Sequence, residues 1–154
     1  MIQKGKIRQI SVIGGSNPDS ETVTLAVDVG KVVAERGAVL ICGGLGGVME
    51  AAARGAKEKG GLTVGILPGY DKESANRFID IVVRTGLGHA RNILVVASGD
   101  LLIALPGSHG TRSEVSVALL LGKQVIGLKA WGMIMGVRQV DSLRELEKEL
   151  LPIF

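Results

Sequence analysis

Short apolar runs alternate with longer segments of helical periodicity along most of the chain. The runs are rich in Val, Ile and Leu, and several end in Gly-Gly or Pro-Gly, which is typical of buried strands that stop at a turn. They predict strands within residues 7–15, 38–44, 62–69, 79–86, 100–107 and 124–130. The segments between them predict helices within residues 16–37, 47–61, 89–99, 111–123 and 141–151. Residues 70–78 are polar and irregular.

The alternation of continuous apolar strands with helices indicates a parallel sheet that is covered on both faces. We predict an α/β fold, a three-layer, Rossmann-like doubly wound parallel sheet, in a single domain that covers residues 1–154. The commonest winding of such a sheet puts the strand within 7–15 beside the strand within 100–107. Ligands bind in the crevice where the winding direction reverses.

The composition limits the classes of partner. The chain has 154 residues, of which 46% are hydrophobic and 3% aromatic, and its net charge is +3. Its Lys and Arg residues are scattered, and few rings are present to stack on bases, so we expect no nucleic-acid partner. No apolar run is long enough to cross a bilayer, and the N-terminus lacks a signal-peptide pattern. We therefore expect no membrane partner and a cytoplasmic protein.

Disulfide and metal chemistry are also disfavoured. Cys42 is the only cysteine, which excludes an intramolecular disulfide and a thiolate zinc cage. His89 and His109 are the only histidines, and no metal-binding spacing accompanies them. We therefore expect no metal site and no required cofactor.

Three glycine-rich turns, each between a predicted strand and a predicted helix, form the candidate ligand site. In the expected winding these turns lie side by side, and each leads into a helix N-terminus whose free N–H groups and dipole favour an anion. Three such ends around one crevice predict a phosphate site, although ordinary tight connections also use glycine. The candidate binding residues are Gly14, Gly15, Ser16, Asn17, Gly43, Gly44, Gly46, Gly47, Gly107, Ser108, His109, Gly110 and Thr111.

Several known phosphate and nucleophile motifs do not fit these turns. A dinucleotide-binding GxGxxG is broken because Met49 occupies its third glycine position, and no Gly-Lys pair is followed by the Ser or Thr of a P-loop. Ser108 sits in a near match to the GxSxG nucleophile elbow. No histidine follows His109 in the chain to serve as its base, which argues against a serine hydrolase.

Two segments carry a resemblance to a known family. "CGGLGGVMEAAARGAKEKGG" and "GHARNILVVASGDLLIALPGSHGTRSEV" are similar to the Lonely Guy superfamily, whose better-known enzymes are nucleoside 5′-monophosphate phosphoribohydrolases that activate cytokinins. The PGGxGTxxE motif of that superfamily matches residues 106–114, and the arginine of its MxxRK motif matches Arg91. The resemblance implies that Arg91 and Glu114 are catalytic, acting on the ribose and glycosidic bond of a nucleotide whose phosphate the glycine turns hold.

The sequence also departs from that pattern. Ser108 replaces a glycine, Gly88 replaces the methionine, and Asn92 replaces the lysine after the arginine. "TGLGHARN" and "GGVMEAAARGA" look closer to the branch that includes molybdenum-cofactor carrier proteins, which bind a phosphorylated pterin. The resemblance therefore leaves two alternatives, a phosphoribohydrolase and a non-catalytic carrier of molybdenum cofactor or another phosphopterin. We expect a nucleotide or a molybdopterin-type ligand as the bound molecule. A lysine decarboxylase, the label of some members, is disfavoured because no pyridoxal-phosphate site is recognisable.

The residues by themselves leave the roles of the two candidate catalytic groups open. Thr111 and Glu114 have capping-box spacing, so Glu114 could serve only to complete a helix start. Arg91 is predicted near a helix N-terminus, where the dipole disfavours a cation unless an anion or carboxylate compensates for it. His109 could contact a phosphate or lie in solvent.

Two of the predicted helices are apolar on more than one face. They contain "NILVVASG" and "EVSVALLLG", and each has more apolar positions than one contact with a sheet requires. Exposed apolar faces of this kind mark subunit interfaces. We therefore expect a homodimer or a dimer of dimers.

Overall fold

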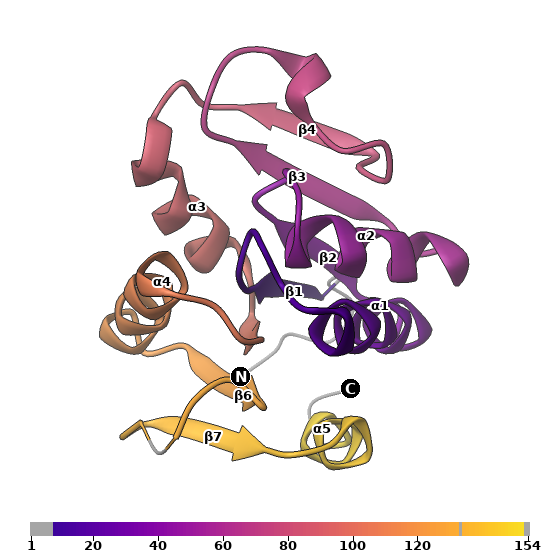
Figure 1. Cartoon of the computed structure of the whole chain (residues 1–154), viewed down its shortest axis with the longest axis vertical. Helices are drawn as coiled ribbons and strands as arrows, with labels where there is room; N and C mark the ends of the chain where they lie inside the picture. Colours follow the sequence, from indigo (N-terminus) through magenta and orange to yellow (C-terminus); the bar gives the residue numbers. More distant parts are fainter. Residues whose placement is uncertain (1–7, 133, 153–154) are drawn as a thin grey trace.

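A computed structural model describes residues 8–132 and 134–152, which form one α/β domain. Its sheet is parallel throughout and has the strand order β4-β3-β2-β1-β5-β6-β7 (Figure 1). The strands are β1 (Gln9–Ile13), β2 (Val39–Cys42), β3 (Thr63–Leu67), β4 (Ile81–Arg84), β5 (Leu101–Ala104), β6 (Gln124–Leu128) and β7 (Val137–Val140).

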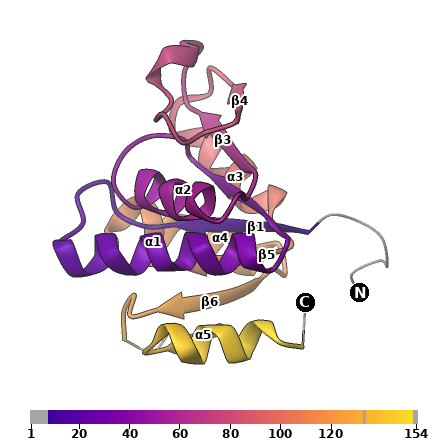
Figure 2. The same cartoon turned by 90° about the vertical axis from the view of Figure 1, so that its right-hand side faces the viewer.

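The helices cover both faces of this sheet. Helices α1, α2 and α5 lie on one face, and α3 and α4 lie on the other (Figures 1 and 2). The described helices are α1 (Ser20–Glu35), α2 (Val48–Glu58), α3 (Arg91–Ser98), α4 (His109–Leu120) and α5 (Leu143–Leu150), with short 3-10 helices at Lys72–Ser74 and Gly88–Ala90. The predicted three-layer, doubly wound architecture is confirmed.

The alternation of side chains along the strands explains why both faces carry a core. In β1, Ile10 and Val12 pack into the core under α1, α2 and α5, whereas Ile13 packs into the core under α3 and α4. In β5, Ile103 packs into the core under α1, α2 and α5, and Leu102 packs into the core under α3 and α4. Since successive strand side chains point to opposite faces, a strand that is apolar at every position fits only a sheet covered twice.

Strand β7 was not predicted from the sequence. It has four residues at one edge of the sheet and pairs only with β6, and two of its four side chains, Arg138 and Gln139, are polar. An edge strand this short and polar lacks the apolar run by which the other strands are recognised.

The candidate site lies at the centre of the sheet, where the winding direction reverses. Strand β1 pairs in parallel with β2 on one side and with β5 on the other, as predicted. The three glycine turns follow these three neighbouring strands and therefore meet at one edge of the sheet.

Helices α1 and α2 pack closely because each has a glycine at the contact. A Cβ added to Gly30 would lie 1.9 Å from the carbonyl oxygen of Ala52, and one added to Gly55 would lie 1.8 Å from that of Val27. These distances leave no room for a methyl group against backbone atoms. The close contact sets where α2 begins, and so helps to position the second glycine turn.

We predict that Gly30→Ala lowers the free energy of unfolding by at least about 2 kcal/mol, although alanine is the better helix former, because the overpacking outweighs the gain in helix propensity. The measurement is urea unfolding followed by circular dichroism. Gly69→Ala is the control, since an added Cβ there meets no atom within 4 Å. Equal midpoints for the two variants would contradict the prediction.

Candidate functional site

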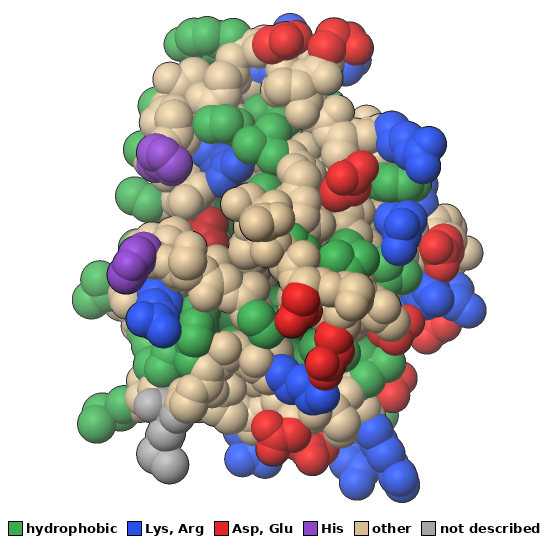
Figure 3. Space-filling model, in the orientation of Figure 1, with side chains coloured by type: hydrophobic (Ala, Val, Ile, Leu, Met, Phe, Trp, Pro, Cys, Tyr) green, Lys and Arg blue, Asp and Glu red, His purple; other side chains and the backbone are tan. Residues whose placement is uncertain are grey.

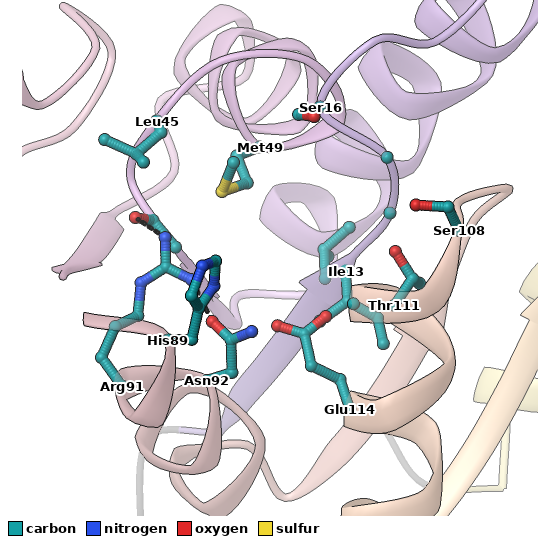
Figure 4. Close-up of a pocket in the computed structure, with 15 residues that line it drawn as sticks. Ile13, Ser16, Leu45, Met49, His89, Arg91, Asn92, Ser108, Thr111 and Glu114 are labelled. Carbon is teal, nitrogen blue, oxygen red and sulfur yellow. Dashed lines mark hydrogen bonds between the residues drawn. The ribbon is translucent and has the colours of Figure 1, made fainter. Parts of the chain in front are cut away.

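A cavity of about 230 Å³ opens at the C-terminal ends of β1 and its neighbours (Figure 4). Its walls come from the three glycine turns, the start of α2, the start of α3 and the first turns of α4. The lining residues are Val12, Ile13, Gly14, Gly15, Ser16, Gly43, Leu45, Met49, His89, Arg91, Asn92, Ser108, Gly110, Thr111 and Glu114.

The backbone of Gly15 connects the three turns. Its N–H donates to the carbonyl of Pro106 in the turn after β5, at 2.9 Å, and its own carbonyl accepts from the N–H of Val48 at the start of α2, at 3.0 Å. The turns therefore form one hydrogen-bonded unit rather than three independent loops.

The structure brings most, but not all, of the predicted residues to this cavity. Arg91, Glu114 and seven turn residues line it, namely Gly14, Gly15, Ser16, Gly43, Ser108, Gly110 and Thr111. Asn17 and Gly107 line a neighbouring hollow at the start of α1, Gly47 lines another beside α2, and His109 lines a larger cavity described below. Gly44 and Gly46 belong to the second turn but do not line the cavity.

The three helix ends differ in their capacity to bind an anion. At α1 the carboxylate of Asp19 caps the helix and accepts from the N–H of Thr22 at 2.8 Å, and these hydrogen bonds lower the pKa of Asp19. At α2 and α4 the cap residues, Gly47 and Ser108, make no side-chain capping bond. The structure thus leaves two helix ends, not the expected three, without an acidic side chain at the cap.

Helix α4 begins earlier than the sequence predicted. Its first residue is His109 and its cap is Ser108, so Thr111 lies inside the first turn and Glu114 in the second. A capping box places its glutamate three residues after the cap. The capping-box interpretation of Glu114 is therefore wrong, and its side chain points into the cavity instead (Figure 4).

Glu114 is an unusual carboxyl group because it is buried without a direct partner. Its exposed fraction is 8%, and none of the hydrogen bonds or ion pairs found among the described residues involves its carboxyl. Burial raises the pKa of Glu114 to about 7, and the nearby charge of Arg91 only partly opposes this. A group with such a pKa can hold or release a proton near neutral pH.

Arg91 is held against the second glycine turn. Its Nη2 donates to the carbonyl of Gly43 at 3.2 Å, and its Nη1 donates to Oδ1 of Asn92. Its Nε is buried and has no hydrogen-bond partner in the described part of the chain. Burial lowers the pKa of Arg91 from its usual value, although the charge of Glu114 partly opposes this. A Cβ on Gly43 would lie 2.6 Å from Sδ of Met49 and 2.8 Å from Nη2 of Arg91, so a side chain at this position would displace these groups.

Six other lining residues were not among the predicted site residues, and two of them, Val12 and Ile13, belong to β1 itself. His89 and Asn92 flank Arg91 within the motif "GHARN", which could have indicated them, and Met49 and Leu45 lie in or after the second turn. No local pattern shows that Met49 and Leu45 line the cavity near Arg91 (Figure 4), because that depends on how α2 packs against the sheet.

A second and larger cavity, of about 550 Å³, adjoins the first between α3 and α4. Both cavities are lined by His89, Asn92, Gly110 and Glu114. The walls of the second cavity are mainly apolar and come from Ala90, Ile93 and Val117, with His109 at its rim. The two histidines of the chain lie on the same side of the molecule (Figure 3).

The remaining features are the cysteine, possible metal ligands and possible membrane spans. Cys42 is fully buried, and burial raises the pKa of its thiol to about 11, so it packs as a small apolar residue. Among residues 8–132 and 134–152, no three His, Cys, Asp or Glu side chains are grouped so as to hold a metal ion. No helix in the same residues is long and apolar enough to cross a membrane.

Known proteins resemble the chain over nearly its whole length. A protein of Archaeoglobus fulgidus with no described function is 51% identical over 140 residues, which are 91% of this chain and 92% of that protein. A cytokinin riboside 5′-monophosphate phosphoribohydrolase of Mycobacterium tuberculosis is 33% identical over 129 residues, 77% of this chain and 68% of the relative.

Similar solved structures include molybdenum-cofactor proteins. The molybdenum cofactor carrier protein of Chlamydomonas reinhardtii superposes with a TM-score of 0.88 at 29% identity, covering 96% of this chain and 98% of that one. The molybdenum cofactor binding protein of Rippkaea orientalis has a TM-score of 0.79 at 37% identity, covering 97% and 85%. The family model of the SLOG cluster4 family matches residues 7–150, which confirms the resemblance to the Lonely Guy superfamily: the chain belongs to the SLOG cluster4 family.

Proposed function

We propose that the joined cavities bind a nucleoside 5′-monophosphate and that Glu114 and Arg91 promote hydrolysis of its N-glycosidic bond. The observation that carries this proposal is the carboxyl of Glu114, buried and without a direct partner where the two cavities meet. The 33% identity to a phosphoribohydrolase supports it.

The two cavities differ in the part of a nucleotide that each would accept. The phosphate would lie near Ser108 and Gly110, where the N–H groups at the start of α4 favour an anion. The ribose would then lie beside Glu114 and Arg91, and the base would enter the apolar second cavity.

The proposed reaction requires only water as a second reactant. The water oxygen forms a bond to C1′ of the ribose, the bond from C1′ to the base nitrogen breaks, and its electron pair leaves with the base. One water proton goes to the carboxylate of Glu114 and from there to the departing base, which gives ribose 5-phosphate and free base. The carboxylate also stabilises the positive charge that develops on the sugar ring in the transition state.

A non-catalytic carrier of a phosphorylated pterin is the second candidate. The structural likeness to two molybdenum-cofactor proteins favours it, and so does the presence of Asn92 where the phosphoribohydrolase motif has lysine. A phosphorylated pterin, like a nucleotide, has a flat heterocycle at some distance from a phosphate. Its phosphate would therefore bind in the first cavity and its ring in the second.

Incubation of the pure protein with AMP and its N6-substituted forms tests the proposed reaction. We expect release of free base, with kcat/KM rising as the pH increases through about 7, because Glu114 of the free protein must be ionised. His89 and His109 also face the second cavity, so Glu114→Gln is needed to assign the pH profile. That variant should bind AMP but release base at least about a hundredfold more slowly, as expected for a lost acid–base group.

The same pure protein can be used to distinguish a non-catalytic carrier from a hydrolase. Trp131 is the only tryptophan and its Nε1 donates to the carbonyl of Gly107 at 3.3 Å, so its fluorescence reports on ligand in the neighbouring turn. Saturable quenching by AMP without base release, equal in wild type and Glu114→Gln, would overturn the hydrolase proposal. Oxidised pterin fluorescence in an extract of protein from a host that makes the cofactor would support the carrier.

Glu114 should also make the stability of the fold depend on pH. Its pKa is raised from 4.5 to about 7 in the folded protein, so the folded state binds more protons than the unfolded state between these values. Stability is therefore lost as the pH rises from about 4.5 to about 7, by up to about 3 kcal/mol.

Glu114→Gln removes this loss. We expect its free energy of unfolding, relative to wild type, to increase by about 1 to 3 kcal/mol between pH 4.5 and pH 8 in urea titrations. The exposed Glu73→Gln is the control and should show a smaller change. A difference between Glu114→Gln and wild type that is constant over this range would refute the assignment.

We further propose that the protein is a homodimer through the exposed apolar face of α3 and α4. Ile93, Leu94, Leu120 and Leu121 are exposed there, Leu120 by 85%. Sedimentation analysis should show a dimer for the wild type and a monomer for Leu120→Glu, because the interface would bury the introduced charge. Leu62→Glu, before β3, should remain a dimer, and a monomeric wild type would disprove the proposal.

A further inference from the structure

Arg91 and Glu114 carry opposite charges and line the same cavity, yet they do not form an ion pair. The salt bridges among the described residues do not include one between them. In a partly dehydrated site their attraction is stronger than in water, so the two side chains should approach each other unless something prevents it. Their separation therefore needs a structural cause.

The side chain of Asn92 lies between the guanidinium of Arg91 and the carboxyl of Glu114 (Figure 4), and it lines both cavities. Its Oδ1 accepts from Nη1 of Arg91. This contact also determines which way the amide group points, because a guanidinium offers only donors and the oxygen must face it. The NH₂ group of Asn92 consequently lies on the side of Glu114 (Figure 4).

A second contact fixes Arg91 on its other side. Its Nη2 donates to the carbonyl of Gly43 at 3.2 Å, so the guanidinium is held between the second glycine turn and Asn92. A planar guanidinium held at two of its nitrogens has little freedom to turn towards a third group. Loss of the Asn92 contact would release the half of the guanidinium that faces Glu114.

We propose that Asn92 is a positioning residue that keeps Arg91 and Glu114 apart, so that both charged groups face the ligand instead of neutralising one another. This inference deepens the proposed function, on which its consequence for ligand binding depends. A ligand in the cavity can then donate a hydroxyl proton to Glu114 and accept from Arg91. The lysine of the phosphoribohydrolase motif could not do the same at this position, since an ammonium group has no acceptor for Arg91.

Two substitutions should move the pKa of Glu114 in opposite directions. Asn92→Ala frees Arg91 to reach the carboxylate, which should lower the pKa of Glu114 by at least about one unit. Asn92→Asp keeps an acceptor for Arg91 and adds a negative charge beside Glu114, which should raise that pKa by about one unit. The measurement is an NMR titration of the side-chain carboxyl carbon of Glu114 in full-length, ligand-free protein, assigned with Glu114→Gln.

The control is Gln124→Glu, which adds the same charge at an exposed position at the start of β6, away from the cavity. It should leave the pKa of Glu114 unchanged, and urea midpoints will show that each variant is folded. If Asn92→Ala leaves this pKa unchanged or raises it, Asn92 does not separate the pair and the inference is overturned.

Ligand binding provides an independent measurement. We expect Asn92→Ala to weaken the binding of AMP about tenfold, the equivalent of one charge-assisted contact, in a titration followed by Trp131 fluorescence. Unchanged AMP affinity in that variant would refute the consequence for binding. If the wild type binds no AMP, the proposed function fails, but the opposite pKa changes in the ligand-free variants still decide whether Asn92 separates the pair.

Discussion

The hydrogen bonds of Gly15 are the interaction on which the site depends. Through its N–H and carbonyl, Gly15 joins the turn after β5 to the start of α2, and its own turn follows β1. This arrangement is available only because β1 lies between β2 and β5 in a parallel sheet, so that three chain reversals meet at one edge. The position of the cavity therefore follows from the order of the strands in the sheet.

The site combines an anion-binding region with a pair of buried charges. The starts of α2 and α4, two helix ends without an acidic side chain at the cap, border the cavity that Arg91 and Glu114 also line. Burial works against the charged form of both side chains, as the raised pKa of Glu114 and the lowered pKa of Arg91 show. Functional sites often carry groups that reduce stability, since such groups remain available for a ligand.

Much of the architecture could be predicted because its signals are local. A run of mainly apolar residues predicts a strand that is buried on both faces, and the structure confirms this for β1 and β5. The family resemblance identified Arg91 and Glu114 as candidate catalytic residues. The structure places both in one cavity, although they lie on different helices. Strand β7 was missed because a short polar edge strand has no such pattern.

The sequence by itself determined the order of the helices and of six of the seven strands, and the positions of the glycine turns, because these depend on periodicity and on residues close together in the chain. The tertiary structure decided the rest. Only packing shows that α4 starts at His109, which releases Glu114 from a capping role. Only packing also places Asn92 between the two charged groups, since side chains from separate helices become neighbours through the sheet that both cover.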